Sequence, residues 1–105
     1  MTEKRKPTYD LRAIQHAFRT PSRLAATTTA LRAAVALGFD RGDIVQTIQG
    51  LERRHFYKSM TSYADSKLWQ DVYHAPSPVG TLYVKFVADT VTEFRPVSFK
   101  EKDNG

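Results

Sequence analysis

The residues of this chain that could do chemistry are lysine, tyrosine and glutamine side chains in its second half. Lys58, Gln70 and Tyr83 each stand in a short run of aromatic and β-branched residues, and Lys100 follows near the end. Lysine and tyrosine can carry protons, and lysine can also stabilise negative charge that develops during a reaction. Glutamine can orient a polar ligand by hydrogen bonds. Together these groups are suited to acid–base chemistry on a phosphate ester.

RNA is the phosphate ester that requires least from such groups, because its 2′-hydroxyl group is a built-in nucleophile. The protein need only remove that proton, protonate the departing 5′-oxygen and stabilise the charge on phosphorus. A free lysine, with a pKa of about 10.4, is a poor base at neutral pH, but a second cation nearby lowers that pKa. Lys58 and Lys100 would be neighbouring cations if they share one face of the fold.

Cysteine and histidine offer little alternative chemistry. The chain has no cysteine, which excludes disulfides, thiolate metal ligands and a cysteine nucleophile. Its histidines, His16, His55 and His74, are not at the helical spacings that usually mark a pair of metal ligands. We therefore expect neither a metal site nor a bound cofactor.

The charge of the chain points to a polyanionic partner. Its 16 Lys and Arg against 11 Asp and Glu give a net charge of +5, which suits nucleic acid, although many folded domains are simply basic. No apolar run approaches the roughly 18 residues that span a bilayer, and no apolar signal-peptide core follows the charged residues 1–6. We therefore expect one cytoplasmic domain over residues 1–105 with no membrane partner. Its ends, at about 1–8 and 103–105, are expected to be flexible.

Apolar periodicity predicts three helices in the first half of the chain. Their expected N-caps are Asp10, then Thr28 or Thr29, then Asp40, and the last two helices end at Gly38 and Gly50. The second and third helices together resemble a helix-turn-helix motif. The third, however, offers only Arg41 as a basic residue and no row of base-reading side chains. We expect it to pack against a sheet instead.

From Phe56 onward, aromatic and β-branched residues predict a series of strands separated by turn-like segments. The expected strands are Tyr57–Tyr63, Trp69–His74, Leu82–Val87 and about Thr92–Lys100. The simplest architecture is an α+β domain, with three N-terminal helices packed on one face of an antiparallel sheet. Pro96 cannot donate a ladder hydrogen bond, so the last strand should be bulged or exposed there.

Strand alternation predicts which side chains share the open face of this sheet. The apolar alternate residues, such as Leu82, Val84 and Phe86, or Val97 and Phe99, should face the helices. The opposite face then collects Lys58, Gln70, His74, Tyr83, Lys85 and Lys100. A basic surface with an aromatic ring in it can bind single-stranded RNA by phosphate contacts and base stacking.

These residues also have ordinary structural explanations. Lysine, glutamine and tyrosine are usual on any exposed sheet face. Trp69 is expected in the core rather than as a platform for a base, and Met60 could either pack in the sheet or contact RNA. The pattern leaves three functions open: an RNA-cleaving enzyme, a regulator that binds nucleic acid without cutting it, and an interaction domain whose basic face binds an acidic partner.

Three blocks of the sequence resemble the MqsR toxin family: residues 56–65, 69–73 and 97–102. The resemblance implies a RelE-like bacterial RNase toxin fold and the toxin of a type II toxin–antitoxin system. It implies an endoribonuclease that cleaves mRNA at GCU-type sites without a metal and without the ribosome. The implied partner is a zinc-binding, DNA-binding antitoxin of the MqsA type. Because the family is also named for the regulation of motility and quorum sensing, the non-cleaving regulator remains an alternative.

The active-site residues of the family correspond, with the same residue types, to Lys58, Gln70, Tyr83 and Lys100. Tyr57 and Met60 match positions implicated in RNA contact, although alternation places Tyr57 on the face opposite Lys58. His74 and Lys85, on the predicted open face, are further RNA-binding candidates. His74 stands where a family member has arginine, so a phosphate contact there should be weaker or dependent on pH. The stretch 88–96 aligns poorly with the family, which bears on the geometry of the last hairpin.

Overall fold

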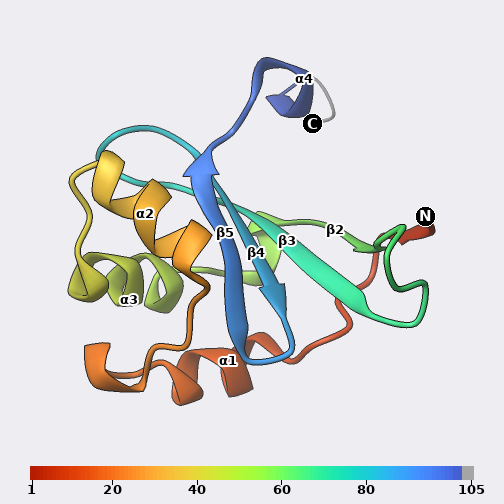
Figure 1. Ribbon diagram of the computed structural model, residues 1–105, viewed down its shortest axis with the longest axis horizontal. Coiled ribbons are helices and arrows are strands. Elements are labelled where there is room, and N and C mark those ends of the chain that lie inside the picture. Colours follow the sequence, from red (N-terminus) through yellow and green to blue (C-terminus); the bar gives the residue numbers. More distant parts are fainter. Residues whose placement is uncertain (103–105) are drawn as a thin grey trace.

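An antiparallel sheet with the strand order β1-β2-β3-β4-β5 is the framework of the computed structural model, which describes residues 1–102 (Figure 1). The strands are β1 (Glu3–Lys4), β2 (Phe56–Thr61), β3 (Trp69–Ala75), β4 (Leu82–Val87) and β5 (Thr90–Pro96). The helices are α1 (Leu11–Ala17), α2 (Thr28–Ala36), α3 (Arg41–Gln49) and the short α4 (Phe99–Lys102). The predicted α+β class is confirmed. Among the described helices, none has the length and apolar character needed to cross a bilayer.

The starts of the helices are set by local sequence. Asp10 caps α1 as predicted, and Asp40 and Asp43 form a capping box at the start of α3, with hydrogen bonds of 2.8 and 2.9 Å. The cap of α2 is Thr27, one position before the predicted pair of threonines. Gly38 follows α2 with a φ of +83°, a left-handed conformation that glycine adopts without steric cost.

One face of the sheet packs against these helices and forms the main core. Leu82, Val84 and Phe86 are buried there, as predicted from strand alternation, next to Ile44 and Ile48 of α3. The rings of Phe39 and Phe94, from the helical half and from β5, lie 5.6 Å apart in the same core. The helices therefore cover one face of the sheet, which leaves the other face for a site.

The N-terminal residues form a strand that the sequence did not predict. We expected residues 1–8 to be flexible, but β1 pairs with β2, with Glu3 opposite Met60. The buried carboxylate of Asp71 accepts hydrogen bonds from the backbone N–H groups of Thr8 and Tyr9, at 2.8 to 3.0 Å. These contacts hold the segment between β1 and α1 against the sheet. The predicted flexible residues 103–105 lie outside the described residues.

Trp69 is less buried than expected. We predicted it in the core, but it is half-buried at the start of β3. The ammonium group of Lys4 lies 4.1 Å from the centroid of the Trp69 ring. The carbonyl oxygen of Trp69 accepts a hydrogen bond from the hydroxyl of Tyr9 at 2.8 Å. The N-terminal segment, rather than the helical core, therefore covers this side chain.

The end of the chain departs most from the prediction. β5 ends at Pro96 instead of continuing to Lys100, and residues 99–102 form α4. Pro96 is exposed, as its missing N–H group requires at this point of an edge strand. The prediction from strand alternation that Lys100 lies on the sheet is therefore wrong. Figure 1 shows α4 beyond the tip of β5, apart from α1, α2 and α3.

Candidate active site

The face of the sheet opposite the helices brings most of the predicted site residues together. Lys58, Val72 and Lys85 lie in register across β2, β3 and β4, and His74 lies opposite Tyr83. Paired residues of neighbouring strands point to the same side of a sheet. We call this surface the open face; it consists of Tyr57, Lys58, Met60, Gln70, Val72, His74, Tyr83, Lys85, Glu93 and Arg95.

A β-bulge places Tyr57 on the open face beside Lys58. The register shifts between Phe56 and Lys58, so that two successive residues of β2 occupy the same side. The ring of Tyr57 stacks on that of His74, with centroids 4.2 Å apart, and the Lys58 ammonium lies 5.3 Å from the Tyr57 centroid. Simple alternation had put Tyr57 and Lys58 on opposite faces, and the bulge corrects that prediction.

A small apolar cluster lies beneath the polar groups of the open face. Met60, Val72, Tyr83 and Val97 are buried together, with Tyr57 packed against them. Of the two roles considered for Met60, packing within the sheet is the one that this cluster shows. Val97 also reaches this cluster although it was predicted to face the helices, because the chain leaves the sheet after Pro96. The cluster fixes the position of the Tyr83 ring from below.

Each strand cation of the open face has a carboxylate partner. The pairs, with their N–O distances, are Lys58–Glu3 at 2.9 Å, Lys85–Glu93 at 2.7 Å and Arg95–Glu101 at 2.8 Å. The open face is therefore a network of alternating charges and not the uniformly basic surface that we predicted. A phosphate group that binds here must compete with these carboxylates.

α4 is attached to the open face through Glu101. Its carboxylate accepts hydrogen bonds from two nitrogens of the Arg95 guanidinium, at 3.0 and 2.8 Å, and from the backbone N–H of Ser98 at 2.7 Å. The hydrogen bonds from Arg95 are the main reason why the pKa of Glu101 falls to about 2. The Arg95 guanidinium in turn lies 3.9 Å from the centroid of the Tyr83 ring. The pair between Glu101 and Arg95 therefore holds α4, with its exposed Lys100, next to Tyr83.

Burial keeps the two central rings of the open face uncharged at neutral pH. It raises the pKa of Tyr83 well above 10, and the negative charges of Glu93 and Glu101 act in the same direction. Burial also lowers the pKa of His74 below 6.5, although Glu101 opposes that effect. The Nε2 atom of His74 is buried and has no hydrogen-bond partner among the described residues. At neutral pH Tyr83 is therefore a protonated phenol that can donate a hydrogen bond, and His74 is a neutral ring.

Three of the four predicted catalytic residues, Lys58, Gln70 and Tyr83, lie together on the open face, whereas Lys100 lies on α4. The predicted RNA-binding residues Tyr57, Met60, His74 and Lys85 all lie on the open face. Sequence reasoning missed the charged partners Glu3, Glu93, Arg95 and Glu101. Glu93 and Arg95 are alternate residues of the predicted last strand, so strand alternation could have placed both on the open face. Glu3 gave no local signal, because its partner is 55 positions away.

Metal ligands do not cluster in the described part of the chain. Within residues 1–102, no group of three or more histidine, aspartate or glutamate side chains is placed to hold a metal ion. The open face offers ammonium, phenol, amide and guanidinium groups, together with the imidazole of His74 and the carboxylate of Glu93. Such a set can donate protons, hold a phosphate and stabilise negative charge.

Comparisons with known proteins agree on one family. The family model described as "Motility quorum-sensing regulator, toxin of MqsA" matches residues 6–101. A curated relative, the "mRNA interferase toxin MqsR" of Escherichia coli (strain K12), is 37% identical over 100 residues, which cover 95% of this chain and 99% of that protein. The family match spans β2 to β5 and most of α4, and so includes every residue of the open face.

Proposed function

The chain belongs to the MqsR toxin family, and on this basis we propose that it is an mRNA interferase, an endoribonuclease that acts as a toxin on messenger RNA. One observation carries the proposal. Lys58, Gln70 and Tyr83 share one face of the sheet, in a chain that is similar over almost its whole length to a toxin named for mRNA cleavage. We propose that a single domain in the cytoplasm performs this reaction.

In this proposal RNA lies on the open face with the scissile phosphate between Lys58 and Tyr83. The 2′-hydroxyl oxygen attacks phosphorus and the bond to the 5′-oxygen breaks, which leaves a 2′,3′-cyclic phosphate and a 5′-hydroxyl group. Lys58 and Lys100 share the proton transfer and the stabilisation of the charge on phosphorus. The phenol of Tyr83, whose raised pKa keeps it protonated, donates a hydrogen bond to the charge that develops on the phosphate. Gln70 orients the RNA.

The proposed RNA contacts surround these groups. Tyr57 and His74 form a stacked aromatic pair on which a base can rest. Lys85 supplies a phosphate contact once RNA displaces Glu93 from it. Met60 lies below the same surface and shapes it. His74 is neutral at pH 7, so its contribution is stacking and not the phosphate contact that the sequence suggested.

Further details of the proposal come from the resemblance to the family. We propose a RelE-like fold, cleavage at GCU-type sites, and activity that needs neither a metal nor the ribosome. The metal-free reaction is supported by the proposed catalytic groups themselves, since the ammonium, amide and phenol groups of Lys58, Gln70 and Tyr83 bind metals poorly. An MqsA-type antitoxin is the proposed protein partner, in line with the description of the matching family as a toxin of MqsA.

One assay separates the proposed function from its alternatives. The purified protein is incubated with a long mRNA, with and without EDTA, and the ends of the products are identified. We expect cleavage that EDTA does not change, with 2′,3′-cyclic phosphate and 5′-hydroxyl ends. Products with 3′-hydroxyl ends, or loss of activity in EDTA, would refute the metal-free mechanism. RNA that is bound but uncut would support the regulator, and RNA that is neither bound nor cut would support the interaction domain.

A further inference from the structure

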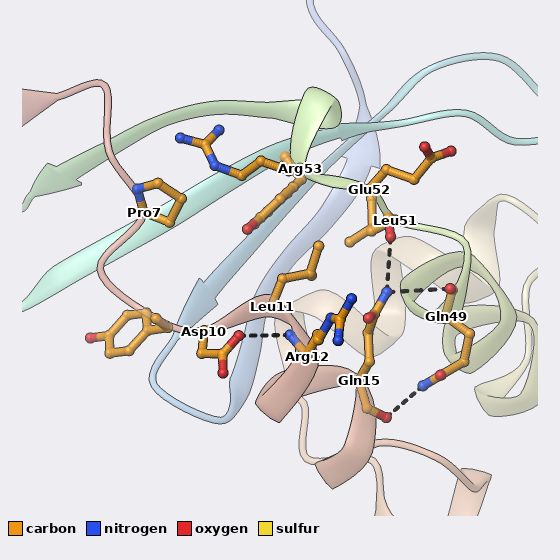
Figure 2. Close-up of a pocket in the computed structure, with 11 residues that line it drawn as sticks. Pro7, Asp10, Leu11, Arg12, Gln15, Gln49, Leu51, Glu52 and Arg53 are labelled. Carbon is orange, nitrogen blue, oxygen red and sulfur yellow. Dashed lines mark hydrogen bonds between the residues drawn. The ribbon is translucent and has the colours of Figure 1, made fainter.

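The polar contacts on the two sides of the sheet join different elements. On the helix side, a hollow of about 620 Å³ lies between α1, the segment before β2, and β3 (Figure 2). In its wall the amide of Gln49 donates a hydrogen bond to the backbone carbonyl of Gln15 at 2.7 Å, which fastens α3 to α1. The charged residues of its lining are two cations and two carboxylates, Arg12, Arg53, Asp10 and Glu52. These contacts stay within the scaffold, whereas those of the open face lead away from the sheet to α4.

A chain of ion pairs crosses the open face from β4 to α4. Lys85 on β4 pairs with Glu93 on β5 at 2.7 Å, and Glu93 also pairs with Arg95 at 3.4 Å. Arg95 pairs in turn with Glu101 on α4, at 2.8 Å. Arg95 therefore connects the sheet to the helix that carries Lys100.

The guanidinium group of Arg95 makes contacts with both its edge and its face. Its two terminal nitrogens donate hydrogen bonds to the two oxygens of the Glu101 carboxylate, at 3.0 and 2.8 Å. One of them also donates to the backbone carbonyl of Pro96, where β5 ends, at 3.1 Å. The flat face of the group lies 3.9 Å from the centroid of the Tyr83 ring. A lysine ammonium has the same charge, but it cannot form a two-pronged pair with a carboxylate while it lies flat on a ring. The shape of Arg95, and not only its charge, therefore links Tyr83 to α4.

α4 is too short to hold its own position. It has four residues, whereas isolated helices of fewer than about 12 residues are marginal in water. Glu101 closes its first turn by accepting a hydrogen bond from the backbone N–H of Ser98 at 2.7 Å, as in a capping box. The one apolar side chain of α4, Phe99, is 81% exposed and so does not anchor the helix in a core. The position of α4, and of Lys100 on it, therefore depends on the contact between Glu101 and Arg95.

We propose that Arg95 is a positioning residue of the RNA-cleavage site, which holds Lys100 at the place relative to Tyr83 that the reaction requires. The inference rests on the proposed function and adds a residue to it. Arg95 acts through Lys100, because its nitrogens hold the adjacent Glu101 while its face lies on the Tyr83 ring. A displacement of about 1 Å in a catalytic group can lower a reaction rate about 10²-fold. Loss of this two-sided contact should therefore slow the chemical step even where the charge at position 95 is kept.

Arg95→Lys separates the shape of this residue from its charge. Single-turnover cleavage of a defined mRNA fragment at saturating RNA gives the rate, and fluorescence anisotropy with a 2′-O-methyl RNA gives the affinity. We expect the rate to fall about 10- to 100-fold. The affinity should stay within about threefold of the parent value, because the charge that attracts phosphate is kept. Arg32→Lys, the same change at an exposed position of α2, should alter neither. A parental rate in Arg95→Lys, or a rate that falls only in step with affinity, overturns the proposal.

A double-mutant cycle tests whether Arg95 acts through Lys100. In a Lys100→Ala protein, Arg95→Lys should change the rate by less than about threefold, because no lysine is left there to be misplaced. A loss of rate equal to that in the parent background would show that Arg95 acts independently of Lys100, which overturns the proposal.

Hydrogen exchange tests the positioning of α4 without RNA. The backbone N–H of Ser98 donates to the Glu101 carboxylate, and that of Glu101 donates to the Ser98 carbonyl. In Arg95→Lys both amides should exchange at least about threefold faster than in the parent, because the contact that holds the turn is weakened. The amides of β4 should exchange at the parent rate, which shows that the sheet remains folded. If the parent protein does not cleave RNA, the proposed function fails, yet faster exchange at Ser98 and Glu101 still supports the positioning of α4 by Arg95. Unchanged exchange at these two amides overturns it, whatever the result of the cleavage assay.

Discussion

The carboxylate of Glu3 lies 2.9 Å from the ammonium group of Lys58, across the paired strands β1 and β2. The contact depends on the N-terminal segment, which Asp71 ties to the sheet through the backbone of Thr8 and Tyr9. In the absence of RNA, a proposed catalytic lysine is therefore covered by a negative charge from the start of the chain. An RNA phosphate that approaches Lys58 has to displace this carboxylate.

Glu3→Gln should strengthen RNA binding at neutral pH. The change leaves the length of the side chain intact but removes the negative charge that competes with a phosphate for Lys58. Partly exposed ion pairs are typically worth about 0.2–1 kcal/mol, so we expect a gain in affinity of about 1.5- to 5-fold. Fluorescence anisotropy with a non-cleavable RNA measures it.

Glu52→Gln is the matched control, because Glu52 is also exposed and paired with an arginine but does not belong to the open face. It should leave RNA affinity nearly unchanged. Equal gains in the two variants would mean that only net charge matters. A loss of affinity in Glu3→Gln would show that Glu3 positions Lys58 rather than competing for it.

The structure shows where strand alternation is a sufficient guide and where it is not. β4 has the predicted bounds, Leu82–Val87, and Tyr83 and Lys85 point to the predicted face because its alternation is regular across the core. The same rule failed at Tyr57, where a bulge adds a residue. It also failed at Lys100, because Pro96 cannot continue the ladder and the chain turns into α4.

Long-range partners were out of reach of the sequence. Residues 1–8 are polar and carry no apolar alternation, so nothing local marks Glu3 and Lys4 as a strand. Their order comes from β2 and from the buried Asp71, more than 50 positions away. The predicted basic surface was incomplete for the same reason. Counting lysines by face does not reveal that a carboxylate from another element lies beside Lys58 and beside Lys85.

Binding of RNA should weaken steeply with salt even though the open face is already ion-paired. Each phosphate of single-stranded RNA that a protein cation neutralises contributes about −0.7 to the slope of log K against log salt. With Lys58, Lys85 and Arg95 engaged, affinity should fall about tenfold or more between roughly 50 and 200 mM salt. Lys58→Ala should make the slope shallower by about 0.7. An affinity that does not change over this range would rule out the open face as a phosphate-binding surface.

Glu101→Gln should loosen α4 without unfolding the sheet. The variant loses a carboxylate that accepts hydrogen bonds from Arg95 and Ser98, at a cost of about 1 kcal/mol for a partly exposed pair. Since the folded pKa of Glu101 is about 2 against an ordinary value of 4.5, its stabilisation is complete above pH 4.5 and is lost as the pH falls toward about 2. Hydrogen exchange at 97–102 measures it. Exchange that matches the parent at pH 7 would show that this pair does not hold α4.

His74 should make the protein less stable as the pH falls below 6.5. Burial lowers the pKa of the folded His74, so below its ordinary value of 6.5 the unfolded chain takes up a proton that the folded chain resists. Folding stability should therefore decrease as the pH falls from about 7.5 to about 5.5, a range above that in which Glu101 titrates. Urea unfolding of the parent and of His74→Gln at both pH values isolates this contribution. If the two proteins lose equal stability, the environment of His74 is not the cause.

Single-turnover cleavage of a defined mRNA fragment by Lys58→Ala, Lys100→Ala and Lys67→Ala tests the central claim, that lysines of the open face and α4 perform the chemistry. General acid–base groups usually contribute about 10²- to 10⁴-fold, so the first two variants should lose rate by that order. Lys67, exposed in the turn between β2 and β3, should tolerate the change. Melting temperatures should stay near the parent value, because Lys58 loses only its partly exposed pair with Glu3 and its contact with the Tyr57 ring. Parental rates in both Lys58→Ala and Lys100→Ala, or rates that fall only in step with RNA affinity, would contradict the catalytic role.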